Sequence, residues 1–250
     1  MADINEAIDI GIVNIINDFQ QHPHYYFTEE DIRWRLLREF ENALVVDGSN
    51  QVPFLNGLTS AIHTEYPTPF RCLMNGRRFQ LLDIENTKGQ RGHFDIVALN
   101  AEATAKCDFE TLRSQYYKVF CDKLKAKEVP LPLLDFAIEL KLFRDLAHPN
   151  RTESAKQQAE YAVQAIRKLE ATVQPNEYYA EPFAKHGIVL LFDNSELVND
   201  TCKVEATRKI FFEEFTKLKW ELLPGTLSCI WVSPQRRLDF GAQIFERHEL

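Results

Sequence analysis

The segment that decides the fold is LLDFAIELKLF, residues 133–143, in which charged residues interrupt an otherwise apolar run. Successive side chains of an extended strand point to opposite faces, so Glu139 and Lys141 share one face, about 7 Å apart. Burying a carboxylate or an ammonium group costs several kcal/mol unless the charge is compensated. We therefore expect either a wet edge strand with an ordinary surface ion pair, or a strand beside a cleft where these charges meet other charges or a bound cation.

Length and composition indicate one globular domain. The chain has 250 residues, of which 45% are hydrophobic, enough for one large core or two small ones. No run approaches the roughly 20 consecutive apolar residues of a membrane span, and the start is acidic where a secretory signal would be basic. Five scattered cysteines without a C-x-x-C pair argue against disulfides and zinc. We expect a single cytoplasmic domain with no membrane segment.

The charge distribution gives a mixed indication about nucleic acid. A formal net charge of −8 is unusual for a nucleic-acid-binding protein. Residues 71–91 and 113–127 nevertheless carry more basic than acidic side chains. These local excesses predict either a positive rim or ordinary solvated faces.

Hydrophobic periodicity predicts the other elements. Helices are expected over residues 1–20, 28–44, 108–127, 155–169 and 204–222. Residues 78–84 and 91–99 flank a glycine-containing loop and predict a hairpin, while 187–192 and 227–232 predict buried strands. Residues 48–76 are expected to be irregular, with a short strand at 61–66. The order predicts an α/β fold, a central mixed β-sheet flanked by α-helices, with an inserted helix near 108–127.

Asp95 is the second unusual charge, because it lies in the predicted strand 91–99 with apolar neighbours. If that strand pairs with residues 133–143, Asp95 and Glu139 can approach closely. Two carboxylates at short range raise each other's pKa unless a cation lies between them. Oxygen ligands favour Mg²⁺ or Mn²⁺, so these residues predict a site for a hard divalent ion.

This pattern, Asp95 followed by Glu139-Leu140-Lys141 on a core strand, resembles the PD-(D/E)XK nuclease superfamily, which has the restriction-endonuclease-like fold. Glu29, at the head of the second helix, is similar to the acidic residue that many members place before the core. The resemblance covers residues 28–232, so residues 1–27 would form an N-terminal helical extension and 233–250 a C-terminal tail. All belong to one domain, residues 1–250.

The spacing between the motif residues limits the match. The 43 residues between Asp95 and Glu139 exceed the spacing in many members, so Asp83 on the preceding strand stays an alternative to Asp95. Asp135 shares a face with Glu139 and is expected at the rim. Gln158-Ala-Glu-Tyr161 is similar to the Gln-x-x-Tyr motif of some members.

The resemblance implies a metal-dependent nuclease that hydrolyses phosphodiester bonds, expected in DNA. Asp95, Glu139 and the main-chain carbonyl of Leu140 would bind Mg²⁺ or Mn²⁺. Lys141 would orient the attacking water and neutralise the phosphate, and Glu29 would assist through a second ion or a water. In the same scheme Gln158 would hold the lysine or a phosphate.

Two alternatives remain open. The chain could be a catalytically inactive nucleic-acid-binding or assembly subunit with the same fold, as a homodimer or within a multi-subunit complex, which its net charge favours. It could also be a structural or ligand-binding α/β protein in which the Glu139-Leu140-Lys141 triplet is a coincidence. The motifs do not distinguish DNA from RNA.

Overall fold

The structure, a computed structural model, describes residues 4–45, 50–75, 78–82, 90–113, 117–143, 151–176, 179–197, 201–217 and 226–240. A central sheet organises it. The strands of this sheet are β3 (Ile62–Asn75), β4 (Arg78–Leu82), β5 (Gln90–Leu99), β6 (Leu134–Phe143), β7 (Ala184–Asp193), β8 (Leu227–Val232) and β9 (Arg237–Phe240). They form a seven-stranded sheet in the order β4-β3-β5-β6-β7-β8-β9, in which β6, β7 and β8 are parallel and the other pairs antiparallel. The α/β class and the mixed central sheet are therefore confirmed.

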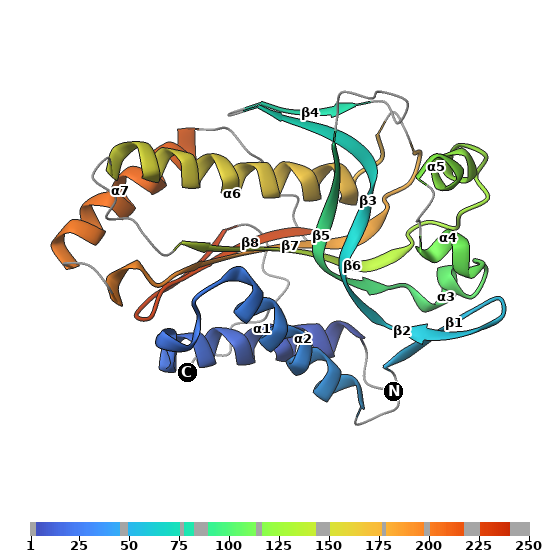
Figure 1. Cartoon of the computed structure of the whole chain (residues 1–250), viewed down its shortest axis with the longest axis horizontal. Coiled ribbons are helices and arrows are strands. Elements are labelled where there is room, and N and C mark those ends of the chain that lie inside the picture. The colour runs from blue at the N-terminus through green and yellow to red at the C-terminus, as the bar shows by residue number, and fades with distance from the viewer. Residues whose placement is uncertain are drawn as a thin grey trace.

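Helices cover both faces of this sheet (Figure 1). The helices are α1 (Ile4–Gln21), α2 (Glu29–Val45), α3 (Ala101–Thr104), α4 (Phe109–Arg113), α5 (Tyr117–Lys125), α6 (Arg151–Val173) and α7 (Thr201–Lys217), with short 3-10 turns η1 (Pro23–Tyr25) and η2 (Ser195–Leu197). In Figure 1, α6 and α7 lie above the sheet and α1 and α2 below it. A separate hairpin pairs β1 (Gln51–Phe54) with β2 (Gly57–Ser60).

The largest departure from the sequence-based expectation concerns β3. The interval expected to be irregular contains this long strand, and β4 and β5 both pair with it, so the predicted hairpin between β4 and β5 is wrong. Pro67 and Pro69 lower the strand propensity of the segment, and its register with β5 shifts between Pro67 and Arg71. Asp83, the alternative to Asp95, lies outside the described residues.

Two further segments differ from their predicted form. The helix expected over 108–127 is present as α4 and α5, separated by residues 114–116, which lie outside the described part of the chain. The segment interpreted as a C-terminal tail contains β9, which pairs antiparallel with β8.

One continuous core joins the layers. The α1 side chains Ile8, Ile12 and Ile15 are fully buried, and the ring of Phe19 lies 4.9 Å from that of Phe192 on β7. Burial of each such side chain contributes roughly 1.5–3 kcal/mol. Helix α1 is therefore part of the core of the domain.

Small residues line the contact between α6 and the sheet. A Cβ atom on Gly187 of β7 would lie 3.1 Å from Leu169 Cβ of α6 and 3.0 Å from Leu227 Cδ1 of β8. The buried alanines of the α6 stripe, Ala155, Ala159 and Ala162, have no exposed surface. The helix can therefore approach close enough for a longer side chain to reach the strands below.

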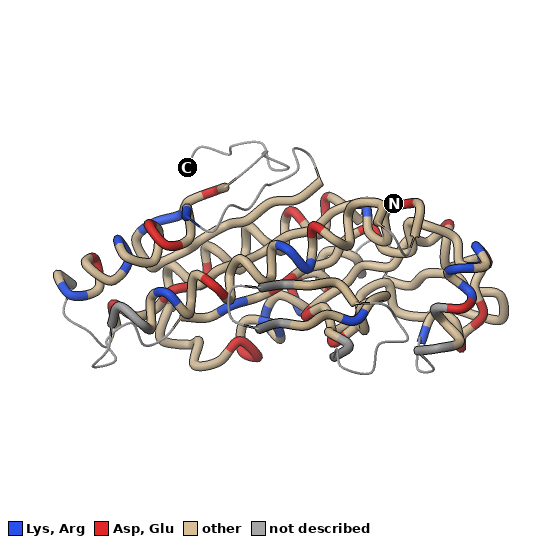
Figure 2. The backbone as a smooth tube through the Cα atoms, turned by 90° about the horizontal axis from the view of Figure 1, so that it is seen from above, with Lys and Arg blue, Asp and Glu red and all other residues tan. Residues whose placement is uncertain are grey.

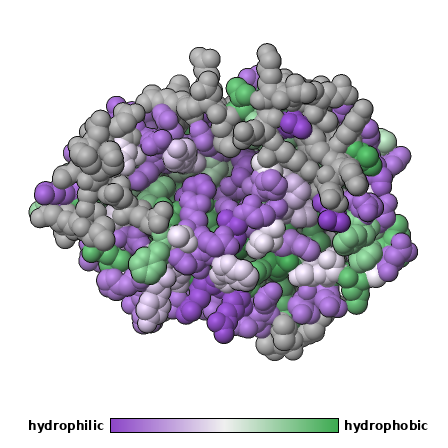
Figure 3. All heavy atoms as spheres, viewed as in Figure 1, coloured by the Kyte–Doolittle hydropathy of each residue, from purple (hydrophilic) through white to green (hydrophobic). Residues whose placement is uncertain are grey.

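Charges are distributed over most of the molecule. Figure 2 shows Lys and Arg interspersed with Asp and Glu along the described backbone, and Figure 3 shows apolar patches separated by hydrophilic side chains on one face. In the basic segment 113–127, Lys123 is paired with Asp108 at 2.9 Å. Among the helices that the structure describes, none combines the length and the apolar character needed to cross a bilayer.

Candidate functional site

The site lies where β5 separates from β6. Val97 is opposite Ala137, Ile96 is opposite Ile138, and the described ladder between the two strands goes no further in this direction. Opposite residues of an antiparallel pair point to the same face, and side chains alternate along each strand. Asp95 and Glu139 lie just beyond the last ladder pairs, where Glu139 contacts Lys168 of α6 and Asp95 contacts Arg33 of α2, yet they are near enough for the Asp95 charge to raise the pKa of Glu139.

Two carboxylates take the place of the missing neighbour of β6. The main-chain amide of Leu140 donates to Asp95 Oδ2 at 2.7 Å, and that of Leu142 donates to Glu29 Oε1 at 3.3 Å. Backbone amides inside a protein need acceptors, and a departing strand leaves them without its carbonyl groups. Asp95 and Glu29 therefore have a structural role at this edge besides any chemical one.

The start of α2 fixes the position of Glu29. Asp31 Oδ2 accepts hydrogen bonds from the amides of Phe27 and Thr28, both at 2.8 Å, and Thr28 Oγ1 accepts from the Asp31 amide at 3.2 Å. These reciprocal bonds cap the helix, as expected for a threonine followed by acidic residues. They hold the next residue, Glu29, at the head of α2.

Lys141 extends from β6 towards Glu29. Its Nζ lies 3.3 Å from Glu29 Oε2 and donates to the carbonyl of its own neighbour, Leu140, at 2.7 Å. Burial alone would lower the pKa of Lys141, but the carboxylates of Glu29, Glu139 and Asp95 outweigh it and raise that pKa. The ammonium group is therefore held in its charged form.

Glu139 is the most buried of the three acids, with 3% of its side chain exposed. Lys168 Nζ, reaching down from α6, lies 2.5 Å from Glu139 Oε1 and donates to the carbonyl of His93 at 2.8 Å. The contact with Glu139 is an ion pair without hydrogen-bond alignment. Burial raises the pKa of Glu139 to about 7; Lys168 opposes this rise and the Asp95 carboxylate adds to it. One lysine therefore does not compensate the buried charge fully.

Arg33, one helical turn after Glu29, completes the cluster. Its Nη2 lies 3.2 Å from Asp95 Oδ1, while Nη1 binds Glu65 of β3 and lies 3.3 Å from Glu30. The three predicted carboxylates, Asp95, Glu139 and Glu29, are thus each paired with a cation, and Arg33 adds contacts with the carboxylates of Glu65 and Glu30.

Comparison of the chain with family models, curated proteins and solved structures finds no match. The geometry alone therefore bears on what the cluster can do.

Of the predicted residues, Asp95, Glu139, Leu140, Lys141 and Glu29 meet at this edge. Gln158 does not join them. It lies ten residues before Lys168 on α6, about 15 Å along the helix. Its buried Oε1 accepts no hydrogen bond from any described residue. Tyr161 of the proposed Gln-x-x-Tyr motif accepts a hydrogen bond from Gln157, which lies outside the motif, at 2.9 Å. No contact among the described residues supports the role predicted for Gln158.

Asp135 also differs from its expected position at the rim. It is 8% exposed, accepts a hydrogen bond from Asn100 Nδ2 at 2.7 Å and pairs with Lys185 Nζ at 2.7 Å. The alternation of β6 places it on the Glu139 face, but its partners link β6 to β7 and to the start of α3. Asp135 therefore acts as a structural tie.

Lys168 and Arg33 were not identified from the sequence. Arg33 could have been predicted from its spacing, because residues four apart lie on the same side of a helix and Arg33 follows Glu29 by four residues. It also follows Ile32, which belongs to the buried stripe of α2. Lys168 could not have been predicted in this way, since a lysine beside an apolar helix stripe is ordinary.

The donor set is suitable for a hard divalent ion. Asp95, Glu139 and the Leu140 carbonyl supply only oxygen, and Mg²⁺ characteristically uses one or two carboxylates while keeping several waters. Over the described part of the chain, no three His, Cys, Asp or Glu side chains are grouped closely enough to hold an ion on their own. The residues therefore fit a largely hydrated Mg²⁺ or Mn²⁺, and they do not fit an enclosed zinc or calcium cage.

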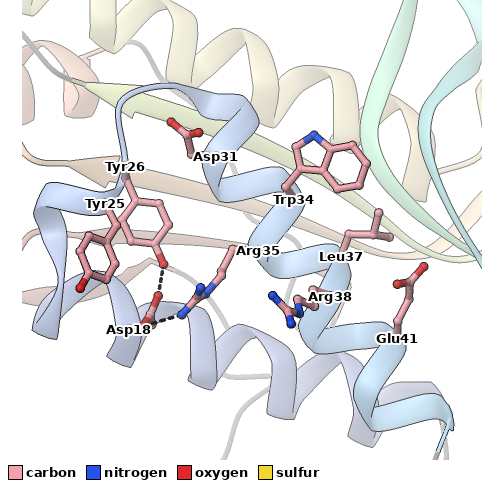
Figure 4. A pocket seen from close by; sticks show the side chains of 9 residues that line it. All are labelled: Asp18, Tyr25, Tyr26, Asp31, Trp34, Arg35, Leu37, Arg38 and Glu41. Carbon is pink, nitrogen blue, oxygen red and sulfur yellow. Dashed lines mark hydrogen bonds and ion pairs between the residues drawn. The ribbon is translucent and has the colours of Figure 1, made fainter.

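A pocket of about 630 Å³ lies apart from this cluster, between α1, η1 and α2 (Figure 4). Tyr25 and Trp34 lie towards opposite ends of it, and Asp18 binds both Tyr26 Oη and Arg35 Nη2, the latter at 3.1 Å. The lining carries acidic and basic groups together and excludes the carboxylates of the cluster. It adds nothing to the chemistry at the β5–β6 edge.

Proposed function

We propose that the protein is a metal-dependent nuclease of the PD-(D/E)XK type, with a restriction-endonuclease-like core, which hydrolyses phosphodiester bonds in DNA. One observation carries the proposal. Asp95 and Glu139 approach each other where two core strands separate, with Lys141 two residues beyond Glu139 on the same strand and Glu29 capping its edge.

Each residue has a role that follows from its contacts. Asp95 and Glu139, with the Leu140 carbonyl, would hold Mg²⁺ or Mn²⁺. When bound, such an ion lowers the pKa of a coordinated water and neutralises charge on the scissile phosphate. Glu29 holds the Lys141 ammonium group at the edge, because its two oxygens bind Lys141 Nζ and the Leu142 amide.

Lys141 supplies the positive charge that does not depend on an ion. Its side chain keeps 25% of its surface exposed, whereas that of Lys168 keeps 11%. A fixed cation that faces developing negative charge in a partly dry site stabilises the transition state. Lys141 is therefore the lysine expected to contact the phosphate, and Lys168 is expected to favour the ionised form of Glu139 by opposing the rise of its pKa.

The alternative of an inactive binding or assembly subunit is favoured by a different observation. Each of the three carboxylates already has a protein cation, namely Lys168 for Glu139, Arg33 for Asp95 and Lys141 for Glu29. In addition, Asp95 and Glu29 each satisfy a main-chain amide. A cluster of this kind can persist because it stabilises the β6 edge, even without catalysis.

A cleavage assay distinguishes the two functions. We expect the purified protein to cut end-labelled single-stranded or double-stranded DNA with Mg²⁺ or Mn²⁺ and to stop in EDTA. Asp95→Asn, Glu139→Gln and Lys141→Met should each lower the rate by about 100-fold or more. Lys209→Met, at an exposed position of α7 away from the cluster, serves as the control and should cut at the wild-type rate.

If the wild-type protein cuts neither DNA nor RNA with either ion, the claim of activity fails. Binding of labelled DNA by that inactive protein would then support the alternative subunit role.

A further inference from the structure

Arg33 bridges carboxylates of two neighbouring strands. The register of β3 with β5 pairs Thr64 with Ile96 and Tyr66 with Phe94, so Glu65 lies level with Asp95 between these pairs. The guanidinium group binds both, with Nη2 at 3.2 Å from Asp95 Oδ1 and Nη1 on Glu65. Glu30 of the same helix lies 3.3 Å from Nη1. Asp95 therefore has a carboxylate on either side of it across the sheet, Glu65 on β3 and Glu139 on β6.

The backbone of Glu65 supports a special role for this bridge. Its φ is 51°, in the left-handed region that side chains other than glycine rarely occupy. A residue stays in such a conformation only when its surroundings require it, and such residues gather at functional sites. The side chain of Glu65 is 55% exposed, so burial does not impose this conformation. Its contact is with the side chain of Arg33, which is only 14% exposed.

The two sides of Asp95 differ in how their charge is balanced. On the β3 side, Arg33 contacts both Asp95 and Glu65. On the β6 side, Lys168 contacts Glu139 and the carbonyl of His93, and no cation among the described residues forms ion pairs with both Asp95 and Glu139. Lys141 lies near enough to both carboxylates for their charges to raise its pKa, but its direct ion pair is with Glu29, so no described cation bridges Asp95 and Glu139 at ion-pair distance.

We infer that Arg33 occupies the place of a second metal ion, so that the site takes up one divalent ion per chain, between Asp95 and Glu139. This inference rests on the proposed function. In two-ion nuclease and phosphatase sites, the ions lie about 3.5–4 Å apart and one stabilises the attacking oxygen and the other the leaving oxygen. Here Asp95 has the carboxylate of Glu65 on one side and that of Glu139 on the other. The guanidinium group of Arg33 contacts both Asp95 and Glu65.

The exchange of Arg33 for an ion is unfavourable for physical reasons. A guanidinium group stays protonated at any working pH and matches two carboxylates with its rigid fork of donors. Its expulsion would leave a mostly buried charge without partners, which is strongly destabilising. Glu29, the earlier candidate for assisting a second ion, is engaged by Lys141 and the Leu142 amide.

Counting bound Mn²⁺ tests the inference without reference to cleavage. Free Mn²⁺ is measured by electron paramagnetic resonance during a titration of the full chain at pH 8. We expect one ion for the wild type, two for Arg33→Met, and one again for Arg33→Met with Glu65→Gln, because the second position then loses a ligand. Arg35→Met is the matched control on the same helix, since Arg35 pairs with Asp18 outside the cluster, and should bind one ion.

Glu65→Gln in the wild-type background gives an independent measurement if Arg33→Met does not fold. We expect one ion with an affinity within about twofold of the wild type, because Glu65 is not a ligand while Arg33 is present. A count of two for the wild type, a lower affinity in Glu65→Gln, or a count of one in folded Arg33→Met would overturn the inference and leave the proposed function standing. A count of zero for the wild type would remove the metal site, and both proposals with it.

Discussion

The main-chain amide of Leu140 donates a 2.7 Å hydrogen bond to Asp95 Oδ2, so a carboxylate 45 residues earlier in the chain completes the edge of β6. The same carboxylate receives Arg33 through its other oxygen. Asp95 therefore joins the stability of the sheet to the charge of the candidate site. Substitutions of Asp95 that keep or remove a hydrogen-bond acceptor therefore separate its contribution to the stability of the sheet from its contribution to the charge of the site.

We predict that Asp95→Ala destabilises the protein more than Asp95→Asn does. Alanine leaves the Leu140 amide without an acceptor, which costs about 1–3 kcal/mol, whereas an asparagine oxygen can still accept from it. Urea denaturation in EDTA measures the difference in unfolding free energy. Equal losses in the two variants would show that the Leu140–Asp95 bond contributes nothing, even though both variants should lose Mn²⁺ binding.

A second prediction concerns the ion pair between Lys168 and Glu139, whose side chains are 11% and 3% exposed. Lys168→Met should lower the unfolding free energy by about 3 kcal/mol, because it leaves a buried carboxylate without its partner. Adding Glu139→Gln to that variant should recover most of the loss. Lys156→Met on the same helix is the control and should cost less than about 0.5 kcal/mol.

If Lys168→Met and Lys156→Met proved equally mild, the ion pair would not be formed in solution. A double variant no more stable than Lys168→Met would mean that the loss comes from packing of the lysine stem instead of from the unpaired charge.

The raised pKa of Glu139 predicts a pH dependence of stability. Its pKa rises from 4.5 to about 7 on folding, so the folded state holds this proton more tightly than the unfolded state does. The stabilisation is complete below pH 4.5 and is lost as the pH rises through about 7. Relative to Glu139→Gln, the wild-type unfolding free energy should fall between pH 4 and 8, by an amount on the order of 3 kcal/mol at most.

Urea denaturation of both proteins across this range, in EDTA, gives the comparison. A difference that stayed constant with pH would mean that Lys168 compensates Glu139 completely and that its pKa is ordinary.

Addition and removal of metal give a further prediction. Because an ion between Asp95 and Glu139 would bind only the folded chain, Mn²⁺ at 100 times its Kd should stabilise the protein by about 2.7 kcal/mol. The melting temperature should rise accordingly and return to its starting value in EDTA. Asp95→Asn and Glu139→Gln should show no such rise, and Lys209→Met should behave as the wild type.

Local patterns were sufficient to predict several elements and part of the site. The alternation of residues 133–143 placed Glu139 and Lys141 on one face, and the helical stripe after Thr28 placed Glu29 at a helix start. These features depend on neighbours within a few residues, where strand and helix periods dictate side-chain direction. They hold whatever the rest of the chain does.

The partners across the sheet could not be predicted in this way. β4 and β5 were expected to pair with each other, but β3 lies between them, because strand pairing depends on which apolar faces the whole core buries. The role predicted for Gln158 depends on tertiary structure in the same way, since its distance from Lys141 is set by how α6 lies on the sheet.

The amino-acid sequence by itself determined the α/β class, the strand that carries Glu139 and Lys141, and the unusual position of Asp95 between apolar neighbours. Only the tertiary structure decided that β5 separates from β6 at Asp95 and that Lys168 and Arg33 arrive from opposite faces of the sheet to balance the acids. The physical reason is the separation in sequence between the residues that interact. Side-chain direction follows from local backbone geometry, whereas compensation of a buried charge is a contact between segments far apart in the chain, and it exists only once the core has brought them together.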